Sequence, residues 1–154
     1  MTTAVPPDSG RPRVRQAERA DLLAIYRIEQ ESFPQPWPFA ALEKHLGEPG
    51  FLVAETGPVI GYIVAATVPS HVEPLGHIKD LAVRADSRGQ GVGTRLLERA
   101  LAVLDARGIP SVKLEVREGN EPARRLYHSH GFGHRRTVPG YYSDGDDAIV
   151  MVRS

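Results

Sequence analysis

Cysteine is absent from the 154 residues of this chain, which excludes disulfides, thiolate metal sites and a cysteine nucleophile. Neither sign of charge prevails, because 19 basic residues balance 19 acidic ones. A protein without a net charge has no strong electrostatic field that would attract it to nucleic acid or to an anionic membrane. Long apolar runs are missing as well, since a run such as Ile63–Ala66 is far too short to cross a bilayer. We therefore expect a soluble, cytoplasmic protein with no nucleic-acid or membrane partner.

The N-terminal segment, residues 1–12, lacks the apolar core that a signal peptide needs. Its prolines and small polar residues predict a disordered tail instead. The remainder, residues 13–154, is long enough to bury a real hydrophobic core. It contains no internal repeat or low-complexity segment, so we expect one folded domain behind a loose tail.

The most informative feature that is present is a glycine-rich segment between an apolar run and an amphipathic run. A loop of this kind that opens a helix aims unpaired backbone N–H groups at one point, where the helix dipole also favours negative charge. Glycine lets the backbone approach an anion closely, because no Cβ stands in the way. These properties predict a pocket for a phosphate or pyrophosphate. The candidate residues are Arg88, Gly89, Gln90, Gly91, Val92, Gly93 and Thr94.

Two other glycine-rich designs fit this segment poorly. A P-loop requires a Gly-Lys pair, and the chain contains none. A dinucleotide fingerprint requires a glycine where Thr94 stands, and it follows its strand directly, whereas five residues separate Val83 from Gly89. Glu115 lies where a ribose-binding acid is expected, about 20 residues further on. It falls inside a strand-like run, however, and not at a strand end.

Apolar periodicity and turn residues divide the chain into short elements. Alternating runs predict strands, apolar stripes at helical spacing predict helices, and Gly or Pro marks their ends. Asp21 is the expected cap of the first helix and Asn120 that of the last, while the prolines of residues 32–38 exclude helix there. The expected strands are 13–17, 51–55, 59–68, 77–83, 111–117, 134–138 and 147–152, and the expected helices are 22–31, 39–46, one from Thr94 to Gly108 and one from Asn120 to Gly131.

Residues 88–93 have the pattern Arg-x-x-Gly-x-Gly after a strand, which resembles the acyl-CoA loop of the GNAT family of N-acetyltransferases. Residues 114–132 resemble that family's second motif, with Leu-Glu-Val-Arg, Asn, Ala, Leu-Tyr and Gly-Phe in the same order. The match covers about residues 14–151. It implies an α/β (α+β) fold: a central, mostly antiparallel mixed sheet of roughly six or seven strands, with splayed strands 4 and 5, flanked by about four helices. It also implies acetyl-CoA as the co-substrate.

Acyl transfer to an amine requires a base for the amine, a hydrogen-bond donor for the thioester carbonyl and a proton for the leaving thiolate. Glu115 is the candidate base, and it shares one face of its strand with Lys113 and Arg117. The same pattern fits a solvated strand residue paired with a basic neighbour. The resemblance implies the catalytic role, because ribosomal-protein N-terminal acetyltransferases use the matching Glu as base, with proton transfer through water.

Tyr127 is the candidate acid. A phenol is a neutral donor at pH 7, so it can supply its proton to the sulfur as the C–S bond breaks. A helical tyrosine also fits a plain core position, whereas the resemblance implies donation to the CoA sulfur. The resemblance further implies that backbone N–H groups at the end of the strand before the glycine loop donate to the thioester carbonyl. It also implies that Asn120, at the start of the last helix, contacts the CoA arm, although a plain N-cap role fits Asn120 equally. These cofactor-binding candidates are Leu81, Ala82, Val83 and Asn120.

Two more segments resemble a narrower branch, the protein N-terminal (Nα) acetyltransferases. Residues 32–37 read Ser-Phe-Pro-x-Pro-Trp, like the ribosomal-protein alanine acetyltransferases, and residues 141–148 resemble the paired-Tyr and Asp-Gly-x-Asp-Ala segment of the Nα enzymes. The branch implies a peptide entrance between these loops and, as acceptor, a protein N-terminus, ribosomal proteins included. Plain packing of aromatic side chains fits both loops as well. The substrate candidates are Phe33, Pro34, Tyr141 and Tyr142.

Gln35 stands where some Nα enzymes place an acid, which leaves the role of base to Glu115. An α-amine has a pKa of ~8 against ~10.4 for lysine, so its neutral fraction at pH 7 is larger by a factor of a few hundred. A single weakly activated carboxylate then suffices for direct attack on the thioester in a ternary complex.

Several alternatives stay open. His128 and His130 are two apart on the expected helix and point away from each other, so we expect no metal site. An acetyltransferase for a small amine would carry the same motifs. A non-catalytic acyl-CoA-binding module would keep the glycine loop without needing Glu115 and Tyr127. These motifs do not encode the oligomeric state or the preferred N-terminal residue.

Overall fold

The structure, a computed structural model, describes residues 11–69 and 72–154. The expected tail, residues 1–12, therefore lies outside the described residues except for Arg11 and Pro12. The strands of the described residues are β1 Arg13–Gln16, β2 Gly50–Glu55, β3 Val59–Val68, β4 Leu75–Val83, β5 Ser111–Arg117, β6 Gly133–Val138 and β7 Ala148–Arg153. Their helices are α1 Leu22–Ser32, α2 Phe39–Glu43, α3 Val92–Ala106 and α4 Glu121–Ser129, with the short 3-10 turns η1 Arg19–Asp21 and η2 Ala85–Ser87.

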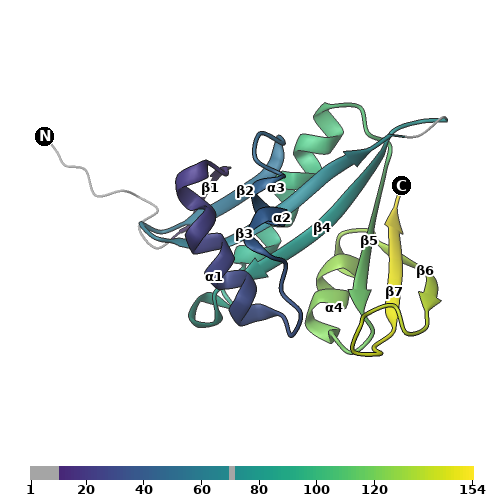
Figure 1. Cartoon of the computed structure of the whole chain (residues 1–154). Coiled ribbons are helices and arrows are strands. Elements are labelled where there is room, and N and C mark those ends of the chain that lie inside the picture. Colours follow the sequence, from purple (N-terminus) through teal and green to yellow (C-terminus); the bar gives the residue numbers. More distant parts are fainter. Residues whose placement is uncertain (1–10, 70–71) are drawn as a thin grey trace, which may run out of the picture. The chain divides into compact units, whose positions relative to one another are not determined.

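Within the described ranges, the strands form a 7-stranded sheet in the order β1-β2-β3-β4-β5-β7-β6 (Figure 1). The pairs β1–β2, β5–β7 and β6–β7 are antiparallel, and β4–β5 is parallel. This mixed sheet and its accompanying helices confirm the predicted fold class.

The described residues form two compact units. Unit 1 comprises those up to Val64 together with Asp80–Val103, and it contains α1, α2 and the glycine loop. Unit 2 comprises those of Ala65–Lys79 together with Leu104–Ser154, and it contains β5, α4, β6 and β7.

The core of unit 1 lies between α1 and the strands that α1 covers (Figure 1). The stripe expected on α1, formed by Leu22, Ile25 and Ile28, is buried and packs with Phe51 and Val53 of β2. Burial of such side chains stabilises the fold by about 1.5–3 kcal/mol each. The apolar spacing read from the sequence thus identifies the buried face of α1 correctly.

Asp21 is the N-cap residue of α1, as expected, but its side chain makes no capping hydrogen bond. Its carboxylate instead accepts two hydrogen bonds from Arg15, at 2.8 and 2.9 Å, and one from the backbone N–H of Glu18 at 2.8 Å. The hydrogen bonds from Arg15 are the main reason why the pKa of Asp21 is lowered. A charged, forked donor competes successfully for the oxygens that a helix cap would need.

Several element boundaries differ from the expectation. Helix α3 begins at Val92 and not at Thr94, because Arg95 N–H already donates to Gly91 C=O at 3.1 Å. Helix α2 stops at Glu43, and tighter three-residue turns carry the chain on to residue 46. Strand β4 begins at Leu75, since the parallel pairing with β5 starts there.

In unit 2, β5, β7 and β6 run side by side with α4 next to them (Figure 1). Strand β5 alternates as expected: Val112, Leu114 and Val116 are buried, whereas Lys113 and Glu115 are only partly buried. The buried face packs in the core and the other face remains available for chemistry.

Candidate active site

The predicted phosphate-binding segment lies in unit 1 as a turn followed directly by α3. Gly89 and Gly91 have φ angles of 76° and 82°, which residues with a side chain rarely adopt. A Cβ built on either glycine would meet no atom within 4 Å, so the turn faces open space. The backbone N–H groups just before Arg95 belong to the first turn of α3, where no intrahelical partner exists. This turn is suited to hold an anion.

A cavity of about 520 Å³ borders the turn in unit 1. Three arginines and one glutamate contribute to its wall, which gives it excess positive charge. The cavity therefore suits a ligand with phosphate groups, such as a nucleotide, better than a neutral ligand. The lining residues are Arg11, Pro12, Ile60, Gln90, Gly91, Arg95, Glu98 and Arg99.

Arg88 links the ends of two secondary-structure elements within unit 1. Its Nε donates to the carbonyl of Val83, the last residue of β4, at 2.9 Å, and a terminal nitrogen donates to Ser32 Oγ, at the end of α1, at 3.2 Å. The guanidinium therefore fixes the glycine turn to the ends of α1 and β4. The sequence did not indicate this structural role, and the contact of Arg88 with a phosphate stays a prediction.

The predicted carbonyl donors lie at the end of β4. The parallel ladder joins Leu75–Ile78 to Ser111–Leu114, and β4 continues beyond it to Val83. The N–H of Leu81 already donates to Asp80 Oδ1 at 3.0 Å. This hydrogen bond engages the N–H of Leu81, and the donation by Leu81, Ala82 or Val83 to a thioester carbonyl stays a prediction.

Glu115 contacts two basic side chains of unit 2. Its Oε1 lies 2.7 Å from His77 Nε2, and its Oε2 lies 3.6 Å from Lys113 Nζ. The hydrogen bond with His77 is the main cause of a lowered pKa of Glu115, and it outweighs the opposite effect of burial. The carboxylate is therefore ionised at neutral pH and able to accept a proton. Sequence reasoning missed His77, whose position opposite Lys113 in the β4–β5 ladder brings it here.

The paired tyrosines lie in the loop between β6 and β7, also in unit 2. Tyr141 is 51% exposed, and its ring meets that of Tyr142 edge to face with centroids 5.0 Å apart. Burial, and after it the charge of Glu115, raises the pKa of Tyr141. The structure thus brings these two tyrosines and the candidate base into one neighbourhood of unit 2.

A single arginine holds this loop. Arg117 Nη1 donates to both oxygens of Asp144, at 3.0 and 2.9 Å, and to Asp146 Oδ2 at 2.8 Å. The same guanidinium lies 4.0 Å from the centre of the Tyr142 ring, a favourable cation–π arrangement. The acids that follow the tyrosine pair in the sequence are the signal by which these contacts of Arg117 could have been found.

Tyr127 is buried in α4, with 7% of its surface exposed, and its ring meets Phe132 edge to face at 5.8 Å. Asn120 caps this helix, since its Oδ1 accepts from Ala123 N–H at 3.3 Å. The cap role predicted for Asn120 is therefore confirmed, and its contact with the CoA arm stays a prediction, as does the acid role of Tyr127.

The first peptide-flanking loop follows α1 in unit 1. Phe33 and Trp37 are partly buried against the core, and Pro34 is exposed. The N–H of Trp37 donates to Glu29 Oε2 at 2.9 Å. A buried acid thus holds a loop whose prolines prevent regular backbone pairing.

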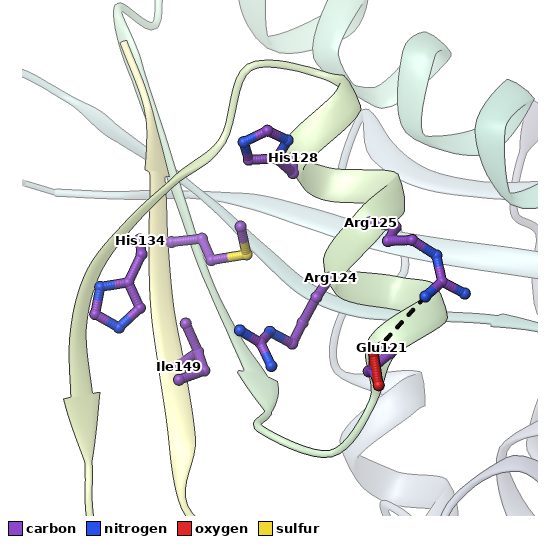
Figure 2. Close-up of a pocket in the computed structure, with 7 residues that line it drawn as sticks. Glu121, Arg124, Arg125, His128, His134 and Ile149 are labelled. Atoms are coloured by element: carbon purple, nitrogen blue, oxygen red, sulfur yellow. Dashed lines mark ion pairs between the residues drawn. The ribbon is translucent and has the colours of Figure 1, made fainter.

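A further cavity of about 530 Å³ lies between α4 and the strands β6 and β7 of unit 2. Figure 2 shows arginine and histidine side chains around it and the Glu121–Arg125 ion pair at its edge, 3.9 Å long. Its lining contains no predicted site residue, so we assign it no part in catalysis. The lining residues are Glu121, Arg124, Arg125, His128, His134, Ile149 and Met151.

The described part of the chain contains neither a candidate metal site nor a candidate membrane span. No group of at least three His, Cys, Asp or Glu side chains there is arranged to hold a metal ion. No helix within those residues combines the length and the apolar character needed to cross a membrane.

Comparison with known proteins places this geometry in a family. Residues 22–132 match the Acetyltransferase (GNAT) family. An N-alpha-acetyltransferase of Sulfolobus acidocaldarius is 36% identical over 152 residues, which cover 90% of this chain and 90% of that protein. The ribosomal protein bS18-alanine N-acetyltransferase of Escherichia coli is 32% identical over 143 residues, covering 90% and 94%. The crystal structure of Ard1 from Thermoplasma volcanium has a TM-score of 0.85 at 31% identity, covering 93% of this chain and 97% of that one.

The chain therefore belongs to the GNAT family, as its two motifs predicted. It is an acetyltransferase of the GNAT type, and its relatives include proteins named N-alpha-acetyltransferase and ribosomal protein bS18-alanine N-acetyltransferase.

Proposed function

We propose that residues 13–154 act as one catalytic domain that transfers the acetyl group of acetyl-CoA to the N-terminal α-amine of a protein. The observation that carries this proposal is the ionised Glu115, held by His77 and lying within electrostatic reach of Tyr141. An acceptor amine needs a nearby carboxylate to take its proton, and a peptide needs side chains beside that carboxylate to receive its first residues.

The glycine turn and the positive cavity beside it suit the diphosphate of acetyl-CoA, because both offer donors and cations to an anion. The backbone N–H groups of Ala82 and Val83 would polarise the thioester carbonyl. Tyr127 would return a proton to the departing sulfur. The amine attacks the carbonyl carbon directly, the C–S bond breaks, and the proton of the amine passes to Glu115 through water.

The lowered pKa of Glu115 matters for the choice of acceptor. A carboxylate that holds a proton weakly is a poor base for a lysine side chain with a pKa of ~10.4, but it is adequate for an α-amine with a pKa of ~8. The Escherichia coli relative acts on the alanine of a ribosomal protein by its name. A ribosomal protein with a small N-terminal residue is accordingly the first acceptor to test, and we expect the reaction in the cytoplasm.

The test is acetylation of a peptide panel that varies the first residue, with release of CoA thiol as the readout. The chain contains no cysteine, so a thiol reagent detects CoA without a protein background. Peptides with a blocked N-terminus and one internal lysine serve as matched controls. We expect turnover only with free N-termini. Turnover with blocked peptides, or with small amines alone, would refute the proposed acceptor.

A further inference from the structure

A second group of titratable side chains is buried in unit 1, apart from the residues assigned above. Glu29 of α1 and Tyr62 of β3 are 1% and 0% exposed. The hydroxyl of Tyr62 hydrogen-bonds to Glu29 Oε1 and lies 3.1 Å from Asp80 Oδ2 of β4. One phenol thus bridges two buried carboxyl groups. We call these three residues the acid cluster.

The two acids of this cluster cannot both ionise at low cost. Burial raises the pKa of Asp80 well above its ordinary value, and the hydrogen bond and charge of Glu29 act in the same direction. Like charges in a poorly solvated site repel each other, so the raised pKa of Asp80 favours a state in which the two carboxyl groups share one proton.

Each acid also holds a backbone segment. Glu29 Oε2 accepts from the N–H of Trp37 at 2.9 Å, and Asp80 Oδ1 accepts from the N–H of Leu81 at 3.0 Å. Trp37 closes the loop that carries Phe33 and Pro34. Leu81 directly precedes the predicted carbonyl donors of β4. The acid cluster thus connects the peptide-flanking loop of unit 1 to the strand end that would face the thioester.

We propose that Asp80 is a positioning residue, which together with Tyr62 and Glu29 fixes the loop at residues 33–38 against the end of β4. This inference rests on the proposed function, because that function gives both segments their roles. Loss of the shared proton at higher pH places two charges side by side, opens the cluster and loosens the loop.

Several other titratable or charged side chains lie near Asp80 or near Trp37. Glu29 from α1 and Tyr62 from β3 face Asp80. Arg88 ties the same ends of α1 and β4 through exposed hydrogen bonds. The ring of His45 lies 5.6 Å from that of Trp37, so an experiment that observes the tryptophan uses a variant without this imidazole.

The first experiment follows the fluorescence of Trp37, the only tryptophan of the chain, as a function of pH in a His45→Gln background. We expect an emission change on the alkaline side as the shared proton leaves. Asp80→Asn should abolish it, because an amide donates to the Tyr62 hydroxyl and accepts from the N–H of Leu81 without titrating. An identical pH response in both proteins would overturn the inference. This readout needs no enzymatic activity, so it stands even if the proposed acceptor is wrong.

The second experiment separates positioning from mere folding. Asp80→Ala should raise the KM for an N-terminal peptide about tenfold, since it removes a buried hydrogen-bond partner, while the Kd for CoA changes less than about twofold. Asp80→Asn should recover most of the loss at pH 7 and remove the alkaline limb of kcat/KM. Asp105→Asn, at an exposed site of α3, is the matched control. A folded Asp80→Ala protein with wild-type KM would refute the role, whereas absence of peptide turnover in the wild type would refute only the proposed function.

Discussion

Glu115 and His77 lie on neighbouring parallel strands with Oε1 and Nε2 2.7 Å apart. Because β4 and β5 are in parallel register at this point, His77 stands opposite Lys113 and its ring reaches the carboxylate two residues further along β5. The contact fixes the direction of the carboxylate and lowers its pKa. The proposed base and the side chain that orients it thus come from segments 38 residues apart in the chain.

We expect Glu115→Gln to reduce kcat with an N-terminal peptide by ~10²-fold, the usual contribution of a positioned general base. Lys113→Gln removes a weaker neighbour of the same carboxylate and should change kcat less than about threefold. Steady-state kinetics with saturating acetyl-CoA measure both. Equal effects of the two substitutions would show that Glu115 acts only through the local charge.

The Glu115–His77 pair also predicts a pH-dependent stability. A carboxyl whose pKa is lowered in the folded state contributes stability above its unfolded pKa, and this contribution disappears as the pH falls through the folded value. Glu115→Gln should therefore have a lower Tm than the wild type at pH 7, with the difference shrinking below about pH 4. Thermal unfolding followed by circular dichroism at several pH values tests this. A Tm difference that does not depend on pH would contradict it.

The sequence predicted the parts of this protein that depend on local pattern. The alternation of Val112, Leu114 and Val116 identified the buried face of β5, and the spacing of apolar residues identified the core face of α1. Family motifs identified the fold because they fix the order of strands and helices. These features are encoded over a few neighbouring residues, where periodicity determines which side chains are buried.

Contacts between distant segments were not predictable in the same way. The sequence position of Asp21 suits a side-chain helix cap, but in the fold both of its carboxylate oxygens accept hydrogen bonds from Arg15. His77 and Arg117 became functional candidates only through strand register and through a loop that returns to β5. Long-range pairing depends on the whole fold, so a single sequence shows the residue types but not their partners.

Gly91 allows a test of the glycine turn. Its φ of 82° lies in the left-handed region, so Gly91→Ala introduces backbone strain of roughly 1 kcal/mol and moves the N–H groups that would hold the diphosphate. We expect the Kd for CoA, measured by calorimetry, to rise about tenfold. Gly119→Ala is the control, since its added Cβ meets no atom within 4 Å and its φ is not in that region. Unchanged CoA affinity in Gly91→Ala would remove the turn from the binding site.

Tyr127→Phe removes only a hydroxyl from a buried ring. If Tyr127 supplies the proton to the leaving thiolate, kcat should fall by ~10²-fold or more while the Kd for CoA stays nearly unchanged. Tyr127 also packs against Phe132, and phenylalanine preserves that contact, so a core role predicts nearly normal turnover. The comparison of kcat with Tm therefore separates the two roles, and a rate near that of the wild type would exclude the acid assignment.

Arg117 provides the last test, because it connects β5 to the loop of the paired tyrosines. Its guanidinium binds Asp144 and Asp146 and lies over Tyr142. Arg117→Ala should free this loop and raise the KM for an N-terminal peptide by about tenfold, with little change in the Kd for CoA. Arg117→Lys keeps the charge but not the forked geometry, so its KM should fall between those of the wild type and Arg117→Ala. Arg136→Ala on the exposed strand β6 is the matched control. If Arg117→Ala and Arg136→Ala give the same KM, the loop does not contribute to peptide binding, and the acceptor amine must be recognised elsewhere.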